Sequence, residues 1–251
     1  MNMVMCNGTQ TPDVNTAAQF ETALRQQVES GCPGVVLTVS APRMNCFYSG
    51  ACGFFARDSA RNIDPNDAFR VASVTKAITA TTAVRLAAMN RWGLDDPLST
   101  ILPRRLVEKI GALDGLPGPP VLTPRNLLGH TSGIPDYFFD QQFQNRVKTE
   151  PERIWEPEEL VEAALETGQT LFPPGEGFSY GDTGYVLVGI AMERLLDRPL
   201  HEIYREFIFD PLEMNATFLE WREPAKGQEI AHHYDGDKDL RESNLSFDWA
   251  G

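Results

Sequence analysis

One stretch decides how this chain folds and where its chemistry lies: Phe69-Arg70-Val71-Ala72-Ser73-Val74-Thr75-Lys76. It stands where a strand-like apolar run gives way to a helix, and it places Ser73 three positions before Lys76. Residues at that spacing share one face of a helix, with Cβ atoms about 5–6 Å apart. An amine so placed can take a proton from a serine. The alternative is an ordinary amphipathic helix in which Ser73 is the N-cap and Lys76 is solvated, because this tetrapeptide pattern is common.

The composition is that of a globular protein. A chain of 251 residues with 42% hydrophobic and 23% charged residues can form one large domain or two intimate ones. Its 22 basic and 35 acidic residues give a formal charge of −13. That charge argues against a nucleic-acid partner, which needs a basic surface, and favours neutral or cationic small molecules. No run reaches the ~18 apolar residues of a membrane span, so no membrane partner is expected.

The first residues bear on location. Met1-Asn2-Met3-Val4-Met5-Cys6-Asn7-Gly8 contains no basic segment followed by an apolar one. As written it is not a secretory signal. The expected location is therefore cytoplasmic, or periplasmic or secreted if the sequence is a processed form.

The part of the chain before Ser73 predicts a helix and a β-hairpin. Asn15-Thr16 is expected to cap a helix that ends at Gly31. The β-branched run 34–40 and the aromatic run 45–55 flank a proline-containing turn, which is typical of two antiparallel strands. We therefore expect residues 1–72 to form the N-terminal helix and hairpin of an α/β lobe.

From Ser73 onward the pattern becomes helical. The helix that follows has apolar residues at helical spacing, and this stripe is predicted to face the core: Val74, Ala77, Ile78, Thr81, Val84 and Ala88. Further helices are predicted to start near Pro124, Pro157, Gly184 and Pro199. Residues 73–222 should form a mainly helical lobe, and residues 223–251 should begin the return to the α/β lobe.

Four blocks agree in order and spacing with a known family. They are Ser73-Val74-Thr75-Lys76, Leu127-Leu128-Gly129-His130-Thr131-Ser132-Gly133-Ile134, Pro173-Pro174-Gly175 with Phe178-Ser179-Tyr180-Gly181-Asp182-Thr183-Gly184-Tyr185, and Pro211-Leu212-Glu213-Met214-Asn215-Ala216-Thr217. With them the chain resembles the serine β-lactamase and penicillin-binding-protein superfamily over roughly residues 15–251. Within it the similarity is to the class C branch, which includes carboxylesterases, D-amino-acid peptidases and acyltransferases. Four concordant blocks are far more specific than one tetrapeptide.

The resemblance implies an α/β (α+β) fold. An antiparallel sheet flanked by helices would be interrupted, after the Ser-x-x-Lys helix start, by an all-helical lobe, with the site in the cleft between the lobes. Phe247-Asp248-Trp249-Ala250-Gly251 resembles the start of a glycine run after which members of the family continue. We therefore expect a C-terminally truncated chain that lacks the last sheet strands and the terminal helix. A second chain could supply that part, and without it we expect inactivity or instability.

The resemblance also implies roles at the site. Ser73 would be the nucleophile, and its backbone N–H an oxyanion donor. Lys76 would be the base, provided that burial or a nearby cation lowers its pKa from ~10.4. Tyr180 would pass the proton, together with Lys76, from Ser73 to the leaving group. No cofactor or metal is implied, and His130 is expected to be structural rather than a general base.

Asp182 departs from the family pattern, which is usually Tyr-x-Asn where this chain has Tyr180-Gly181-Asp182. An asparagine donates and accepts hydrogen bonds, whereas an ionised aspartate only accepts. As a substrate-binding residue, Asp182 would serve an amide carbonyl poorly. As a partner of Lys76, it would raise the pKa of the lysine.

These residues predict a serine hydrolase that forms an acyl-enzyme on Ser73 with a small-molecule acyl substrate, either an ester or a small amide. Three alternatives stay open. One is a β-lactamase or D-amino-acid peptidase, which Asp182 disfavours. Another is an acyltransferase, which uses the same residues. The third is a catalytically inactive truncated fragment or binding module.

Overall fold

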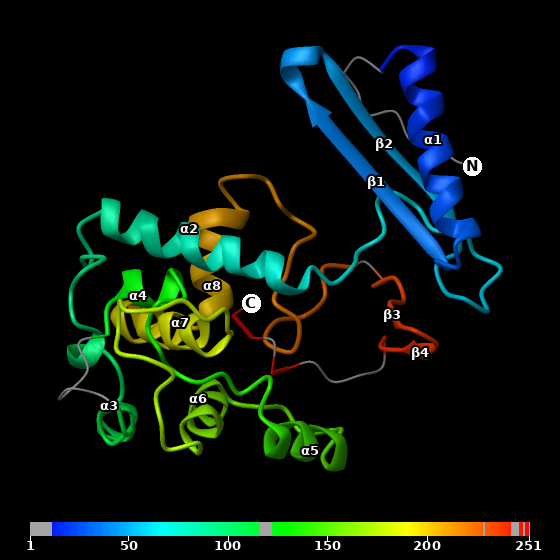
Figure 1. Cartoon of the computed structure of the whole chain (residues 1–251). Helices are drawn as coiled ribbons and strands as arrows, with labels where there is room; N and C mark the ends of the chain where they lie inside the picture. The colour runs from blue at the N-terminus through cyan, green and yellow to red at the C-terminus, as the bar shows by residue number, and fades with distance from the viewer. Residues whose placement is uncertain (1–11, 116–121, 228, 242–245, 248, 251) are drawn as a thin grey trace. The chain divides into compact units, whose positions relative to one another are not determined.

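Figure 1 shows the computed structural model of the chain, which describes residues 12–115, 122–227, 229–241, 246–247 and 249–250. The chain forms two compact units. The first comprises Met1–Arg70 with Gly227–Ser243, and the second comprises Val71–Lys226 with Asn244–Gly251. The first eight residues, on which the expected location rests, lie outside the described residues.

An antiparallel hairpin forms the centre of the first unit, as predicted. Strand β1 (Gly34–Ala41) pairs with strand β2 (Cys46–Gly53) along its whole length. A short 3₁₀ turn (Pro42–Met44) and Asn45, with a φ of 49°, connect the strands. Asparagine tolerates this left-handed conformation better than most residues, so the turn suits its sequence.

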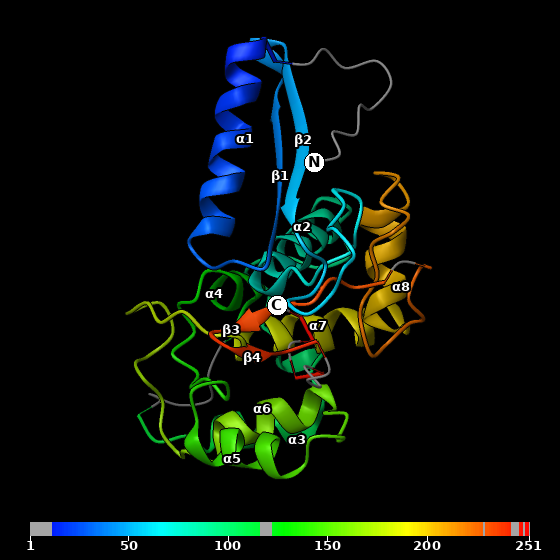
Figure 2. The ribbon, with the colours of Figure 1, turned by 90° about the vertical axis from the view of Figure 1, so that its right-hand side faces the viewer.

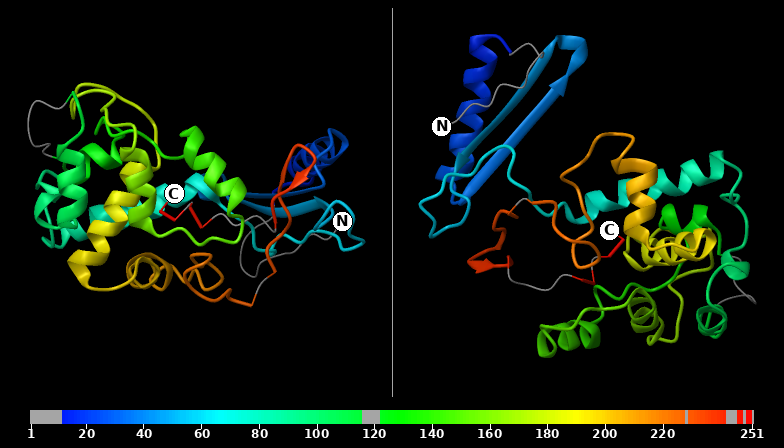
Figure 3. Two further views of the ribbon diagram at one scale, coloured as in Figure 1. Left: turned by 90° about the horizontal axis from the view of Figure 1, so that it is seen from below. Right: turned by 180° about the vertical axis from the view of Figure 1, so that it is seen from behind.

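Helix α1 (Val14–Glu29) lies along the hairpin (Figures 2 and 3). The Phe20 ring of α1 packs on the Tyr48 ring of β2, with 4.9 Å between centroids. The prediction that Asn15-Thr16 caps this helix is wrong. Asp13 is the N-cap, and its carboxylate accepts hydrogen bonds from the backbone N–H groups of the two residues predicted as the cap. A carboxylate is favoured there because the start of a helix carries partial positive charge.

The segment after Lys226 rejoins the first unit. Ala231 donates its backbone N–H to the carbonyl of Ala68 over 2.7 Å. Strands β3 (Tyr234–Asp235) and β4 (Lys238–Asp239) then form a short antiparallel pair. The first unit is therefore built from two segments that lie far apart in the sequence.

Helices make up most of the second unit. In chain order they are α2 (Thr75–Ala88), α3 (Arg104–Gly111), α4 (Pro124–Leu128), α5 (Gln141–Thr149), α6 (Pro157–Leu165), α7 (Thr183–Leu196) and α8 (Leu200–Tyr204). Short 3₁₀ turns occupy Ala72–Val74 and Leu98–Thr100, and a π-helical turn occupies Arg205–Phe209. No helix found in the described ranges combines the length with the apolar character that spanning a bilayer requires.

Local sequence explains several helix starts. The Thr123 side chain caps α4, and Pro124 takes the first helical position. Glu156 and Glu159 form a reciprocal capping box at α6, with Pro157 first in the helix. The capping side chains accept hydrogen bonds from N–H groups that have no partner inside the helix. Proline at the first position has no N–H group that would need a partner. Both starts agree with the sequence-based prediction.

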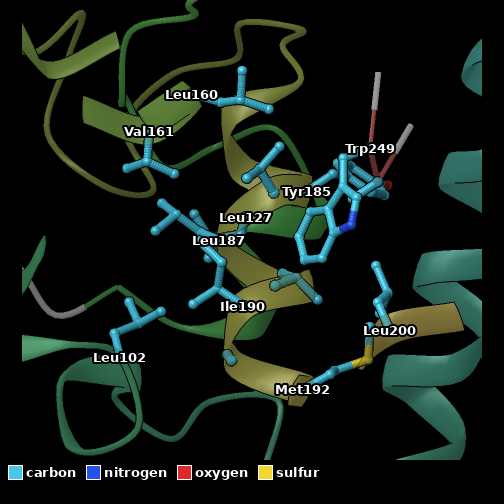
Figure 4. Packing of buried hydrophobic residues seen from close by; sticks show 14 of the residues in the cluster. Leu102, Leu127, Leu160, Val161, Tyr185, Leu187, Ile190, Met192, Leu200 and Trp249 are labelled. Carbon is cyan, nitrogen blue, oxygen red and sulfur yellow. The ribbon is translucent and has the colours of Figure 1, made fainter. Parts of the chain in front are cut away.

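Helix α7 is the centre of the core of the second unit. It contacts α2, α4, α6 and α8, and every residue from Val186 to Met192 is buried. Figure 4 shows Trp249 and Leu200 of α8 on one side of this helix, with Leu160 of α6 near its upper end. A helix that is apolar on all sides is stable only when protein encloses it. Helix α7 is therefore a rigid support for the residues at its N-terminus.

The predicted core face of α2 is wrong. Val74 and Val84 are 63% and 50% exposed, and the buried side chains are instead Lys76, Thr79, Thr82, Ala83 and Leu86. The buried face is partly polar because its polar groups have partners. The Thr79 hydroxyl lies 2.6 Å from that of Tyr204 and donates to the carbonyl of Ala250 over 2.8 Å. Buried polar groups are tolerated when they are hydrogen-bonded.

Gly189→Ala should destabilise the protein, because α7 lies very close to Trp249 at this position. An added Cβ would lie 2.6 Å from Cζ3 of the Trp249 ring. Overpacking a core costs about 1–3 kcal/mol, and at a buried tryptophan ring we expect the upper part of this range, which exceeds the ~1 kcal/mol that alanine gains over glycine in a helix. Urea unfolding measures the net loss. In a Trp249→Ala background the same substitution should be neutral or stabilising, and an equal loss in both backgrounds would show that this contact is not the cause.

Candidate active site

Ser73 lies in the 3₁₀ turn that leads into α2, and it is exposed. The preceding residue, Ala72, has a φ of 44°. A non-glycine residue in the left-handed region costs about 1–2 kcal/mol, and such positions gather at functional sites. The Val74 backbone N–H donates to the Val71 carbonyl over 3.0 Å and closes the turn. The left-handed backbone of Ala72 and the closed turn thus place Ser73 directly before α2.

Lys76 is buried one turn further along α2. It is 6% exposed, and its Nζ donates a hydrogen bond to Ser73 Oγ over 3.2 Å. The same Nζ forms an ion pair with Oδ1 of Asp182. The N-cap position of α2 is Val74, and no side chain caps this helix. The alternative in which Ser73 is an N-cap and Lys76 is solvated is therefore wrong.

The surroundings of Lys76 determine its charge. Burial lowers the pKa of Lys76, but the hydrogen bond and negative charge of Asp182 raise it, as does Tyr180, and the net pKa lies above its ordinary value. The two side chains of the pair are only 7% and 15% exposed, so water screens their attraction weakly. The raised pKa favours the ammonium form of Lys76 at neutral pH, and it is opposite in direction to the lowered pKa that a lysine base requires. Asp182 raises the pKa of Lys76, as expected of a carboxylate partner.

Tyr180 completes the group. Its ring centroid lies 5.0 Å from Lys76 Nζ, and the side chain is 48% exposed. Tyr180 is also a hydrogen-bonding partner that favours the charged form of Lys76. The loop before α7 therefore brings Tyr180 and Asp182 to the residues of α2, although 106 positions separate Lys76 from Asp182. All four predicted side chains lie in one group.

His130 supports the loop that carries Tyr180. Its Nδ1 accepts a hydrogen bond from the backbone N–H of Gly181 over 3.3 Å. Its ring centroid lies 4.6 Å from that of Tyr180 and 5.2 Å from that of Tyr185. These contacts agree with a structural role for His130, because Nδ1 is occupied by a backbone donor.

The support from His130 should depend on pH. Burial and the positive charge of Lys76 lower the pKa of His130 below its ordinary value of 6.5, against the opposing effects of Asp136 and the Gly181 hydrogen bond. A protonated His130 cannot accept the Gly181 N–H. Since the folded-state pKa is the lower one, the stabilisation from His130 is complete above pH ~6.5 and is lost as the pH falls through that folded-state pKa.

We therefore expect the wild-type Tm to fall by a few degrees more than that of His130→Asn on going from pH 6.5 to pH 5. Asparagine is the matched replacement, because it keeps an acceptor oxygen and tolerates the φ of 56° that His130 adopts. Differential scanning calorimetry measures both proteins. Parallel pH profiles would show that His130 does not carry this dependence.

Asp136 is a part of the site that the sequence did not indicate. Its Oδ2 accepts hydrogen bonds from the backbone N–H groups of Asp182 and Thr183, the second over 3.1 Å. Asp136 follows Ile134-Pro135, and an aspartate after a proline signals only a turn. A single sequence gives no signal that pairs it with residues 46 and 47 positions later.

Two expectations about the site concern the backbone and metals. The Ser73 N–H lies just before α2, where the N–H groups of a helix start carry partial positive charge. Its role as an oxyanion donor stays a prediction. In the part of the chain that the structure describes, no group of three or more His, Cys, Asp or Glu side chains is placed to hold a metal ion.

The fold and this group of side chains define a class of protein. A serine at the start of a helix, a buried lysine one turn later and a tyrosine from a second loop are the arrangement that the resemblance to the β-lactamase-like family predicted. The chain belongs to the Beta-lactamase family, whose model matches residues 20–251. The mixed architecture of helices with a small antiparallel sheet is that of the β-lactamase-like fold.

Individual relatives agree with this family. Penicillin-binding protein 4* of Bacillus subtilis is 29% identical over 174 residues, which are 68% of this chain and 34% of that protein. Esterase EstB of Burkholderia gladioli is 29% identical over 216 residues, which are 83% of this chain and 52% of that protein. The crystal structure of a D-stereospecific amidohydrolase from Streptomyces sp. matches with a TM-score of 0.78 at 29% identity, over 95% of this chain and 68% of that one. The chain thus spans about a third to a half of the length of these two curated relatives.

Proposed function

We propose that this protein is a serine hydrolase that forms an acyl-enzyme on Ser73 with small esters or amides. The observation that carries the proposal is the 3.2 Å hydrogen bond between the buried Nζ of Lys76 and Ser73 Oγ. A serine hydroxyl is a weak nucleophile until a neighbouring group activates it. The names of an esterase and a D-stereospecific amidohydrolase among the relatives support this reaction class.

Tyr180 is the better proton acceptor for Ser73, because Asp182 holds Lys76 as an ammonium. The positively charged Nζ of Lys76 lies 5.0 Å from the centroid of the Tyr180 ring, so the two side chains are neighbours. In acylation, Ser73 Oγ bonds to the carbonyl carbon of the substrate while its proton passes to the phenolate form of Tyr180, which becomes a neutral phenol. The tetrahedral intermediate, with its oxyanion next to the Ser73 N–H, then expels the alcohol or amine, which takes that proton.

Deacylation repeats these steps with water. Water gives a proton to Tyr180 and attacks the acyl carbon, and the intermediate collapses to release the carboxylic acid. Ser73 Oγ leaves and regains the proton from Tyr180. Lys76 stays charged throughout and keeps Ser73 Oγ oriented.

Asp182 favours esters among the possible substrates. Its carboxylate faces Lys76 and can only accept hydrogen bonds, so it offers no donor to an amide carbonyl. A β-lactamase or D-amino-acid peptidase is for this reason the second candidate. An acyltransferase would use Ser73, Lys76 and Tyr180 in the same way, with an alcohol or amine in place of water.

Hydrolysis of p-nitrophenyl acetate by wild-type, Ser73→Ala and Ser99→Ala proteins tests the proposal. Quenched wild-type reactions should show an acetyl group on the peptide that contains Ser73, and Ser73→Ala should lose both the label and the turnover. Ser99 is an exposed serine in another 3₁₀ turn, so Ser99→Ala is the matched control and should behave as wild type. Equal rates in wild type and Ser73→Ala would leave the protein as a non-catalytic binding module.

Two further assays separate the alternatives. Turnover of nitrocefin would indicate a β-lactamase. A kcat that rises with added alcohol, with an ester of that alcohol as product, would indicate acyl transfer. We expect neither.

A further inference from the structure

Asp182 occupies the N-cap position of α7 but does not cap this helix. An aspartate at that position ordinarily accepts hydrogen bonds from the N–H groups of the second or third helical residue. In this structure the Asp182 side chain makes no such bond and instead forms the ion pair with Lys76. The backbone N–H groups of Asp182 and of the first helical residue, Thr183, have an acceptor from another segment.

Asp136 is that acceptor. Its Oδ2 receives the backbone N–H groups of Asp182 and Thr183. Its Oδ1 receives the Phe138 N–H over 2.8 Å, which fixes the orientation of the carboxylate. The Tyr137 N–H donates to Thr183 Oγ1 over 3.2 Å, a second link between the same two segments.

Gly181 leaves room for this contact. A Cβ at Gly181 would overlap the Asp136 carboxylate and would lie 3.1 Å from its Cγ. The side chains on either side of Gly181 belong to Tyr180 and Asp182, both in the candidate site. The segment that carries them is thus held against Asp136 through its backbone.

We propose that Asp136 is a positioning residue of the active site: it holds the backbone of Asp182 and Thr183 at the start of α7 and so places the carboxylate of Asp182 on Lys76. The inference rests on the proposed function for its catalytic meaning, but the geometry that it predicts is independent of turnover. Without Asp136, the backbone N–H groups of Asp182 and Thr183 lose their acceptor, and the segment that carries the Asp182 carboxylate is no longer fixed in this place. Lys76 would lose its carboxylate partner, and Ser73 its oriented donor.

Asp136→Ala and Asp136→Asn test this role, with Asp140→Ala as the matched control. Asp140 is also a capping carboxylate in the same stretch of chain, since it accepts the Phe143 N–H over 2.7 Å at the start of α5, which carries none of the candidate site residues. The first measurement is the pH titration of the Lys76 ammonium by ¹⁵N NMR, which needs no substrate. The second is kcat and KM for p-nitrophenyl acetate.

In Asp136→Ala, the Lys76 titration should move to lower pH, and kcat should fall about 10- to 100-fold, as expected when a charge-assisted hydrogen bond that aligns reacting groups is lost. KM should change little. Asp136→Asn keeps one acceptor oxygen and should lie between Asp136→Ala and wild type. Asp140→Ala should lower Tm without moving the titration or kcat.

The outcomes separate this role from a purely structural one. A lowered Tm with an unchanged Lys76 titration in Asp136→Ala would overturn the proposal, as would an equal titration shift in Asp140→Ala. If Asp136→Ala does not fold, Asp136→Asn decides by the same titration. A wild type without turnover, in which Asp136→Ala still moves the Lys76 titration, would refute the proposed hydrolase but support the positioning of Asp182 by Asp136.

Discussion

Lys76→Met is expected to lower kcat for p-nitrophenyl acetate by about 10²–10⁴-fold at pH 7, the range that a positioned proton-transfer system contributes. Methionine keeps an unbranched buried side chain but has no ammonium. It therefore removes the hydrogen bond to Ser73 Oγ and the positive charge beside the Tyr180 ring. KM should change little, because neither of these two interactions is a contact with the bound substrate. Initial rates over a range of substrate concentrations measure both constants.

The same substitution tests the ion pair. Removing one partner of a buried pair costs up to about 3–5 kcal/mol, and Lys76 and Asp182 are only 7% and 15% exposed. Lys76→Met/Asp182→Asn should recover part of the lost stability but none of the activity. Recovered activity would mean that Lys76 serves only to neutralise Asp182. Lys109→Met is the control, because Lys109 pairs with Glu162 at the surface and should lose less than about 1 kcal/mol without any change in kcat.

The features that were predicted correctly are those that depend on neighbours in the sequence. Ser73 and Lys76 meet because three positions along a helix bring side chains onto one face. The starts of α4 and α6 follow from residues that cap N–H groups one turn away. The hairpin follows from two β-prone runs on either side of a turn. In each case the interacting groups lie within one window of the sequence.

The features that were missed depend on contacts between distant segments. The buried face of α2 is polar because Tyr204 and Ala250 hydrogen-bond with Thr79, and the spacing of apolar residues gives no sign of these partners. Asp136 reaches the start of α7 from a separate loop. The resemblance to the family predicted that Tyr180 and Asp182 lie in the site. The charge of Lys76 could not be predicted from the sequence, because it depends on the burial of Lys76 and on its contact with Asp182 in the folded chain.

Asp182→Asn should lower the free energy of unfolding by about 1.5–3 kcal/mol, the contribution of a hydrogen bond to a charged group. Asparagine keeps an oxygen for Lys76 Nζ but removes the charge that raises the pKa of Lys76. In wild type that pKa lies above the ordinary value of 10.5. The stabilisation is therefore complete below pH ~10.5 and is lost as the pH rises through the folded-state pKa. The difference in stability between the two proteins should be constant near neutrality and should shrink in strong base.

Activity then identifies the form of Lys76 that works. Asp182→Asn lowers the pKa of Lys76. If catalysis needs the ammonium form of Lys76, the alkaline limb of the kcat/KM profile therefore moves to lower pH. If Lys76 must instead be neutral to take the Ser73 proton, Asp182→Asn should be faster than wild type at pH 7. We expect the first result, because Asp182 holds Lys76 charged while Lys76 donates to Ser73 Oγ.

Asp95→Asn is the matched control for this profile, because Asp95 pairs with Arg125 at the surface and its loss should leave the alkaline limb in place. A faster Asp182→Asn protein at pH 7 would assign the base to Lys76 and leave Tyr180 as a relay. In that case the charge of Asp182 would lower the activity at neutral pH, and full activity would be reached only in base. The direction of this shift in the kcat/KM profile therefore decides whether Lys76 or Tyr180 accepts the proton of Ser73.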